Sequence, residues 1–119
     1  MATGRLFPAE EALAGRLVSR IVPEGELLPT ARALAREIAD NTSGVSVCLA
    51  RQLLWKMLGA DHPMEAHKLD SRLIHALGAS PDAYEGVQSF LEKRPARFTM
   101  KVSSGLPQPY PWWPERKFE

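Results

Sequence analysis

The sequence contains little that could cross-link its fold or hold it in a membrane. Its 119 residues include one cysteine, Cys48, which excludes an internal disulfide and favours a reducing compartment. No apolar run approaches the roughly 18 residues that a membrane-spanning helix needs. Residues 1–5 are not followed by the apolar core of a signal peptide. We therefore expect a cytoplasmic protein that makes no membrane contact.

An excess of charge of one sign is also missing. Fifteen Lys and Arg residues stand against 14 Asp and Glu residues, so the net charge is +1. This balance argues against a general nucleic-acid binder, which would be clearly basic. Hydrophobic residues make up 45% of the chain and charged residues 24%, which is typical of a globular protein. The length suits one hydrophobic core, and no internal repeat is present.

What the sequence does contain is helical periodicity. Apolar spacing and the positions of Pro, Gly and Ser predict a mainly α fold with about five helices and at most one short strand. The expected helices cover residues 8–15, 26–40, 45–58, 64–77 and 81 to 92 or 93. Residues 18–22 alternate between apolar and polar side chains before Pro23, which indicates either a short strand or an extended link.

Two of the expected helices differ in how much apolar surface they carry. Residues 26–40 form an amphipathic pattern, with Leu34 and Ile38 on a face that we expect to be buried. Residues 45–58 are apolar most of the way round, which is typical of a helix buried on more than one side. Because a chain of this length has few elements to cover both sides, a partner surface is expected there.

The C-terminal stretch, residues 99–119, is rich in Pro and Trp. Five of the ten prolines lie from Pro95 onward. The stretch carries four aromatic side chains, Tyr110, Trp112, Trp113 and Phe118. Two interpretations remain open: a lid laid over the apolar surface of its own domain, or an anchor in a partner's groove, since Trp and Tyr dominate interface hot spots.

Several short blocks occur in an order and spacing that resemble one protein family. The N-terminal blocks are Thr3-Gly4-Arg5, Ala9-Glu10-Glu11-Ala12-Leu13, Gly15, Leu17-Val18 and Val22-Pro23, followed by Leu34-Ala35, Ile38-Ala39, Arg51 and Leu53-Leu54. The C-terminal blocks are Ser80, Asp82, Glu85-Gly86, Phe90, Glu92-Lys93-Arg94, Pro95 and Phe98. Together they are similar to the C-terminal helical, trimerisation region of the enoyl-CoA hydratase/isomerase (crotonase) family. Arg16 and the long tail with Trp112-Trp113 depart from the common pattern.

The resemblance implies a division into a crotonase-like helical region, residues 1–98, and a Pro/Trp-rich tail, residues 99–119. In the family, a spiral of strand-strand-helix turns precedes this region and supplies the oxyanion-hole N–H groups and the catalytic glutamates. None of these maps onto the present sequence, so no catalytic residue is expected here. The resemblance thus implies subunit association and closure of the CoA pocket in acyl-CoA (fatty acid) metabolism, without activity of the isolated chain. The alternative is a non-catalytic helical module for self-association or partner binding.

The resemblance also implies a contact with coenzyme A at Phe90 and Lys93, near its adenine and 3′-phosphate. CoA would be part of a thioester substrate rather than a resident cofactor, and the expected partners are further copies in a trimer-based assembly or a full-length relative. From the residues alone, Lys93, Arg94, Arg97 and Lys101 also fit a solvated cluster of cations at a helix end.

Other possible sites are weak. His62, His67 and His75 could suggest a metal site, but His67 and His75 would lie about 12 Å apart on one helix, too far for one metal ion, so no metal site is expected. Asp70, Ser71 and His75 share one helix, unlike the separate elements that build a catalytic triad. Cys48 is interpreted as a packed residue on an apolar helix.

Overall fold

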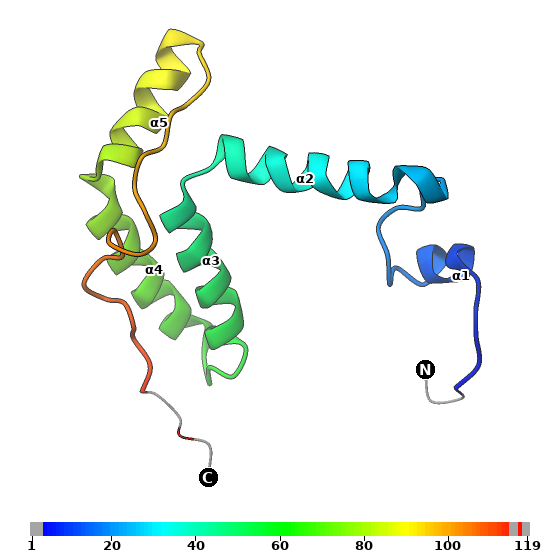
Figure 1. Ribbon diagram of the computed structural model, residues 1–119. Coiled ribbons are helices and arrows are strands. Elements are labelled where there is room, and N and C mark those ends of the chain that lie inside the picture. The colour runs from blue at the N-terminus through cyan, green and yellow to red at the C-terminus, as the bar shows by residue number, and fades with distance from the viewer. Residues whose placement is uncertain (1–3, 115–116, 118–119) are drawn as a thin grey trace. The chain divides into compact units, whose positions relative to one another are not determined.

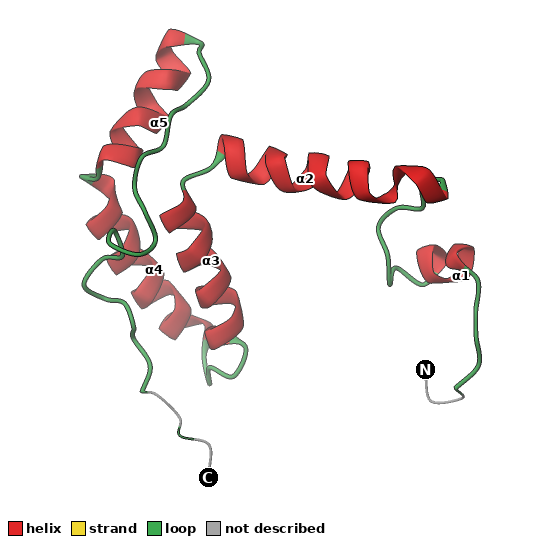
Figure 2. Cartoon of the chain, in the orientation of Figure 1, coloured by secondary structure: helices red, strands yellow, loops and turns green. Residues whose placement is uncertain are grey.

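The computed structural model describes residues 4–114 and residue 117, and it is mainly helical (Figures 1 and 2). Its elements are α1 (Ala9–Ala14), a 3-10 turn η1 (Glu24–Glu26), α2 (Leu27–Asn41), α3 (Gly44–Met57), α4 (Pro63–Gly78) and α5 (Pro81–Glu92). No strand occurs within residues 4–114. The expected mainly α fold with five helices is confirmed, and residues 18–22 form a link rather than a strand. Thr3 and Phe118 lie outside the described residues.

The chain divides into two compact units, Met1–Glu37 and Ile38–Glu119, with the division inside α2. In the first unit, α1 follows Pro8, which is the N-cap rather than the first helical residue, and ends at Gly15. Arg5 forms an ion pair with Glu11 of this helix. The boundary expected between residues 98 and 99 is a different one: it separates the family-like region from the tail, and it stays a prediction.

The second unit is held together by a small apolar core. Helix α4 packs against both α3 and α5. The buried core side chains are Val45 and Leu49 of α3 and Leu69 and Leu73 of α4. Around them pack seven half-buried side chains, namely Leu53, Met57, Leu77, Met100, Leu106, Tyr110 and Trp112. Four of these seven lie beyond α5, so the C-terminal segment completes the core.

Local caps explain where the helices of this unit begin. The Ser43 hydroxyl accepts a hydrogen bond from the N–H of Ser46, and the Ser80 hydroxyl accepts one from the N–H of Ala83 at 3.2 Å. At α4 the ring nitrogen Nδ1 of His62 accepts from the N–H of Met64 at 3.1 Å, and Pro63 is the first helical residue. Each cap satisfies an N–H group that would otherwise have no intrahelical partner.

The segment after α5 runs back beside that helix toward α3 and α4 (Figure 1). Residues 101–105 form a turn in which the N–H of Gly105 donates to the carbonyl of Lys101 at 2.7 Å. A Cβ atom at Gly105 would lie 3.3 Å from Val45 Cγ2, so glycine permits the close approach. Tyr110 and Trp112 then pack on the core of their own unit, as the lid interpretation describes.

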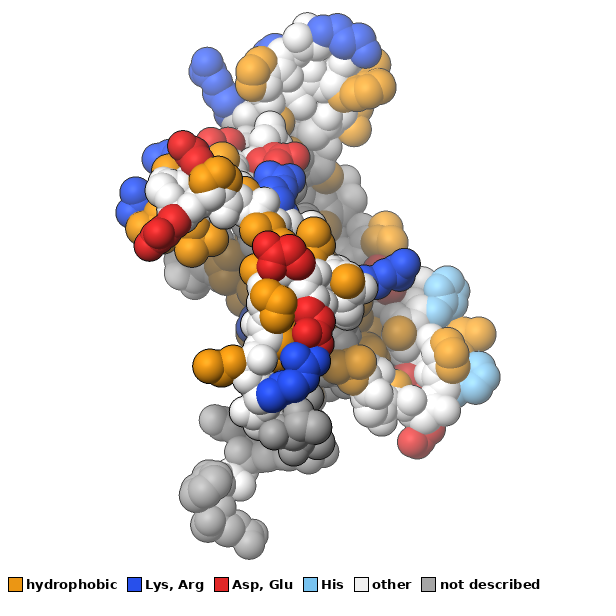
Figure 3. All heavy atoms as spheres, turned by 90° about the vertical axis from the view of Figure 1, so that its right-hand side faces the viewer, with side chains coloured by type: hydrophobic (Ala, Val, Ile, Leu, Met, Phe, Trp, Pro, Cys, Tyr) orange, Lys and Arg blue, Asp and Glu red, His pale blue; other side chains and the backbone are white. Residues whose placement is uncertain are grey.

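The expectation of a buried face on α2 is wrong for this chain. Leu34 is 58% exposed and Ile38 is 49% exposed, and no residue of α2 is buried. The periodicity is real, but neither compact unit by itself covers that face. Helix α3 also leaves part of its apolar surface exposed. It buries Val45 and Leu49 on one side, whereas Leu54 on another side is 76% exposed. Figure 3 shows apolar side chains at the surface of the molecule, interspersed with charged ones.

Candidate functional site

The end of α5 contains an unusual backbone conformation at Lys93. This residue follows Glu92 with φ 55° and ψ 39°, in the left-handed helical region. Its N–H donates to the carbonyl of Phe90, and the N–H of Arg94 donates to the carbonyl of Ser89 at 3.1 Å. This is the Schellman pattern, in which the left-handed position is usually glycine. A non-glycine residue there costs about 1 kcal/mol, so the lysine side chain occupies a position that does not favour it.

The two residues predicted to contact CoA lie together at this helix end. The Lys93 Nζ atom lies 4.2 Å from the centre of the Phe90 ring, a cation–π contact. Phe90 is 70% exposed, and Lys93 is exposed as well. Tyr84, Val87 and Leu91 are also exposed on α5, at spacings of three and four residues. The result is a solvent-facing aromatic ring and ammonium group beside an apolar stripe.

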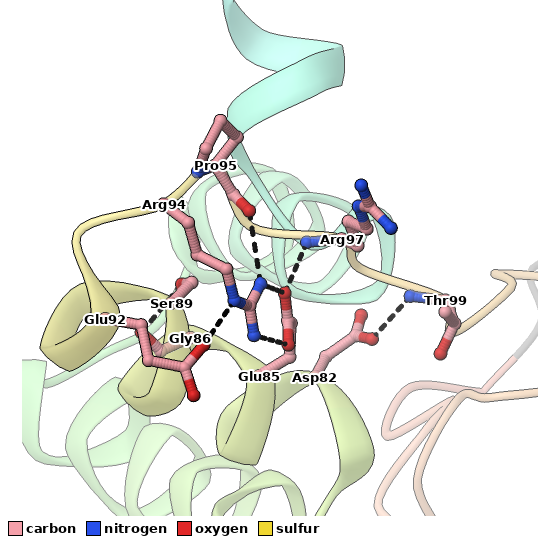
Figure 4. A network of polar contacts seen from close by, with 9 residues as sticks. All are labelled: Asp82, Glu85, Gly86, Ser89, Glu92, Arg94, Pro95, Arg97 and Thr99. Atoms are coloured by element: carbon pink, nitrogen blue, oxygen red, sulfur yellow. Dashed lines mark hydrogen bonds and ion pairs between the residues drawn. The ribbon is translucent and has the colours of Figure 1, made fainter.

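Behind Lys93 the chain reversal is fixed by a network of polar contacts (Figure 4). Arg94 pairs with both carboxylate oxygens of Glu85, at 2.6 and 2.9 Å, and with Glu92 at 2.5 Å. The backbone N–H of Arg97 donates to Glu85 at 2.6 Å. Hydrogen bonds from Arg94, and then from the Arg97 backbone, lower the pKa of Glu85 to about 2. The hydrogen bonds that the Arg94 guanidinium donates to Glu85 and Glu92 raise the pKa of Arg94.

One turn earlier on α5, Asp82 holds the same returning segment. Its Oδ1 atom accepts hydrogen bonds from the N–H of Thr99 at 2.8 Å and of Met100 at 3.1 Å. The residue is 4% exposed. Burial acts to raise the pKa of Asp82, but hydrogen bonds from the Ser43 side chain and from the N–H groups of Met100 and Thr99 outweigh it, so the pKa is lowered. Asp82 thereby links the start of α5 to residues 99 and 100.

The structure gives different surroundings to two of the four cations that the sequence places close together, Lys93 and Arg94. Arg94 forms ion pairs with Glu85 and Glu92 and so stabilises the turn after α5. Lys93 is exposed to solvent and contacts the ring of Phe90. Sequence reasoning missed the framework roles of Asp82 and Glu85. Their spacing of three residues on the first turns of α5 indicates that the two carboxylates share one face of the helix. It does not identify their partners, because those residues follow the left-handed turn at Lys93.

The remaining candidates have ordinary surroundings. His62 caps α4, and Cys48 is a half-buried free thiol. In the part of the chain that the structure describes, no group of three or more His, Cys, Asp or Glu side chains could hold a metal ion. Nor does any described helix have the length and apolarity needed to span a bilayer.

Comparison with known proteins agrees with this architecture. The model of the enoyl-CoA hydratase/isomerase family matches residues 1–101, and the chain therefore belongs to that family. It is 45% identical over 106 residues to the enoyl-CoA hydratase ACTT3 of Alternaria alternata, covering 87% of this chain. It is 35% identical over 92 residues, or 77% of this chain, to the human mitochondrial enoyl-CoA hydratase domain-containing protein 3.

A solved structure shows the same fold. A crystal structure assigned as an enoyl-CoA hydratase/isomerase from Mycobacterium abscessus superposes with a TM-score of 0.77 at 30% identity, covering 85% of this chain and 40% of that one. The present chain spans 35% of the Alternaria relative and 30% of the human one. It thus corresponds to roughly a third of a family member.

Proposed function

We propose that this chain forms the C-terminal helical part of an enoyl-CoA hydratase/isomerase-like protein and contributes one wall of its CoA site. The observation that carries the proposal is the pairing of Phe90 and Lys93, with Nζ 4.2 Å from the ring centre, at an exposed helix end. A ring offers a face for adenine, and an ammonium group is a good point-charge partner for phosphate. The unfavourable backbone conformation of Lys93 supports a role for that side chain.

These two residues are one wall and not a complete site. A ligand as large as CoA requires a concave site that buries most of its surface. An exposed lysine is also screened over about 8–10 Å at physiological salt. The 119-residue chain alone is therefore expected to bind CoA weakly or not at all, and to hydrate crotonyl-CoA no faster than buffer.

The test is calorimetry with CoA on a protein in which a spiral domain of the family precedes this chain. We expect Lys93→Ala to weaken CoA binding there, by a factor that shrinks as salt is raised, and Lys117→Ala to leave it unchanged. Equal affinity of wild type and Lys93→Ala at low salt would show that the lysine only ends a helix.

A second role, as a helical module for self-association in a trimer-based assembly, is supported by the exposed apolar surface. Leu54, Trp55 and Leu58 near the end of α3 are 76%, 69% and 79% exposed. We expect assembly at tens of micromolar in sedimentation experiments and its dispersal by Leu54→Glu. A stable monomer that binds no hydrophobic dye would refute this role without affecting the CoA contact.

A further inference from the structure

A cleft at the other end of the second unit has no part in the proposed CoA contact. It lies between the end of α3 and the tail, whereas Phe90 and Lys93 lie at the end of α5. Its volume is about 660 Å³, within the range of small-molecule sites. The walls come from α3 and its following turn, including Trp55, Lys56 and Met57, and from the tail residues Trp112 and Trp113.

The aromatic content of this cleft is high. All three tryptophans of the chain line it. Trp112 and Trp113 pack edge to face, with ring centres 4.9 Å apart, and Tyr110 meets each of them edge to face at 5.8 and 5.2 Å. Edge-to-face packing fixes the orientation of the rings. Flat apolar walls of this kind favour the binding of a planar aromatic ring system.

The polar side chains of the cleft are hydrogen-bond donors. Lys56 is the only charged residue among the described lining residues, and its Nζ atom lies 4.5 Å from the centre of the Trp113 ring. No carboxylate in residues 4–114 lies within ion-pair distance of it. The indole N–H of Trp112 is buried and has no hydrogen-bond partner among the described residues. An ammonium group and an indole N–H both require an acceptor, and the former favours an anion.

We propose that this cleft binds a small planar aromatic carboxylate, with the ring system among the indoles and the carboxylate paired with Lys56. Charge selects the ligand class: Lys56 is the only charged side chain among the described lining residues, and a carboxylate pairs with its ammonium group. The site depends on the docked tail, because Trp112 and Trp113 form one of its walls. It does not rest on the proposed CoA contact.

The first test uses the wild-type chain and three probes of one shape. β-Naphthoate, β-naphthalenemethanol and β-naphthylmethylammonium share the naphthalene ring and carry a small head group that is anionic, neutral or cationic. Because every tryptophan lines the cleft, all three indole N–H signals in a correlation spectrum of labelled protein report on it. We expect saturable shifts of these signals, with the naphthoate binding at least about fivefold more tightly than the neutral alcohol and the ammonium compound weakest.

The second test changes the cation. Lys56→Met should reduce naphthoate affinity to that of the alcohol, Lys56→Arg should retain it, and Arg51→Met, which removes an exposed cation from the same helix, should leave it unchanged. If Lys56→Met also undocks the tail, the indole signals of Trp112 and Trp113 move to the position of unstructured tryptophan. The proposal is then tested by the probe series on the wild-type chain. Absence of saturable indole shifts, or equal affinity for all three probes, would overturn the proposal.

Discussion

Helices α2 and α4 have nearly the same length and similar apolar stripes, but only α4 buries its stripe. In α4, Leu69 and Leu73 are 8% and 3% exposed against α3, α5 and the tail. In α2, Leu34 and Ile38 are 58% and 49% exposed. The pattern in the sequence therefore specifies that a helix forms and which face is apolar, whereas burial depends on a second surface. For α2 neither compact unit by itself supplies that surface.

The largest effect that tests this comparison is expected in the core. Leu73→Ala should lower the free energy of unfolding by about 2–5 kcal/mol, because it leaves a cavity between α3 and α4. Leu34→Ala on α2 should change it by less than about 0.5 kcal/mol, because that side chain is already exposed. Denaturant unfolding measures both. Similar losses for the two variants would show that α2 is buried in solution, as in an assembled state.

The next effect concerns the polar link between α5 and the returning segment. Asp82→Ala should lower the free energy of unfolding by about 1.5–3 kcal/mol, since it removes a charged acceptor from two backbone N–H groups. Asp40→Ala removes an exposed carboxylate from α2 and should have little effect. If the two variants unfold alike, the returning segment is not held through Asp82.

Low pH should lower the stability of the same region, because Glu85 becomes protonated. Because the folded-state pKa of Glu85 is lowered from 4.5 to about 2, its contribution is fully present above pH 4.5 and is lost as the pH falls toward 2. Thermal melts across this window should show a smaller decline for Glu85→Gln than for wild type. Glu24→Gln should reproduce the wild-type profile. A decline unchanged in Glu85→Gln would contradict the pairing with Arg94.

The smallest effect isolates backbone strain. At Lys93 the Gly variant should be more stable than the Ala variant by about 1 kcal/mol, because only glycine adopts a positive φ without strain. At Glu92, the last residue of α5, the order should reverse. Arg16, with φ 56°, provides the comparison in the other unit. A Gly–Ala difference seen at Lys93 but absent at Arg16 would show that only the second unit unfolds cooperatively.

The parts of the fold predicted well from the sequence are those with local causes. Ser43, Ser80 and Pro81 mark helix starts through contacts within three residues, so the expected bounds of α3 and α5 agree closely with the structure. The pairing of Glu85 with Arg94 could not be predicted, because it requires the chain to reverse at a lysine in a conformation that glycine usually adopts. The cation–π contact of Lys93 with Phe90 also depends on that left-handed turn, and their contact with CoA stays a prediction.

The carboxylates of Asp82 and Glu85 have a consequence for the exchange of backbone hydrogens with solvent. The N–H groups of Arg97, Thr99 and Met100 lie in irregular structure, where amides usually exchange fast. Each nevertheless donates to a carboxylate of α5. Their deuterium uptake should follow that of α5 itself, because these bonds break only when the segment leaves the helix. By this measure the stretch after α5 opens and closes as part of the helix.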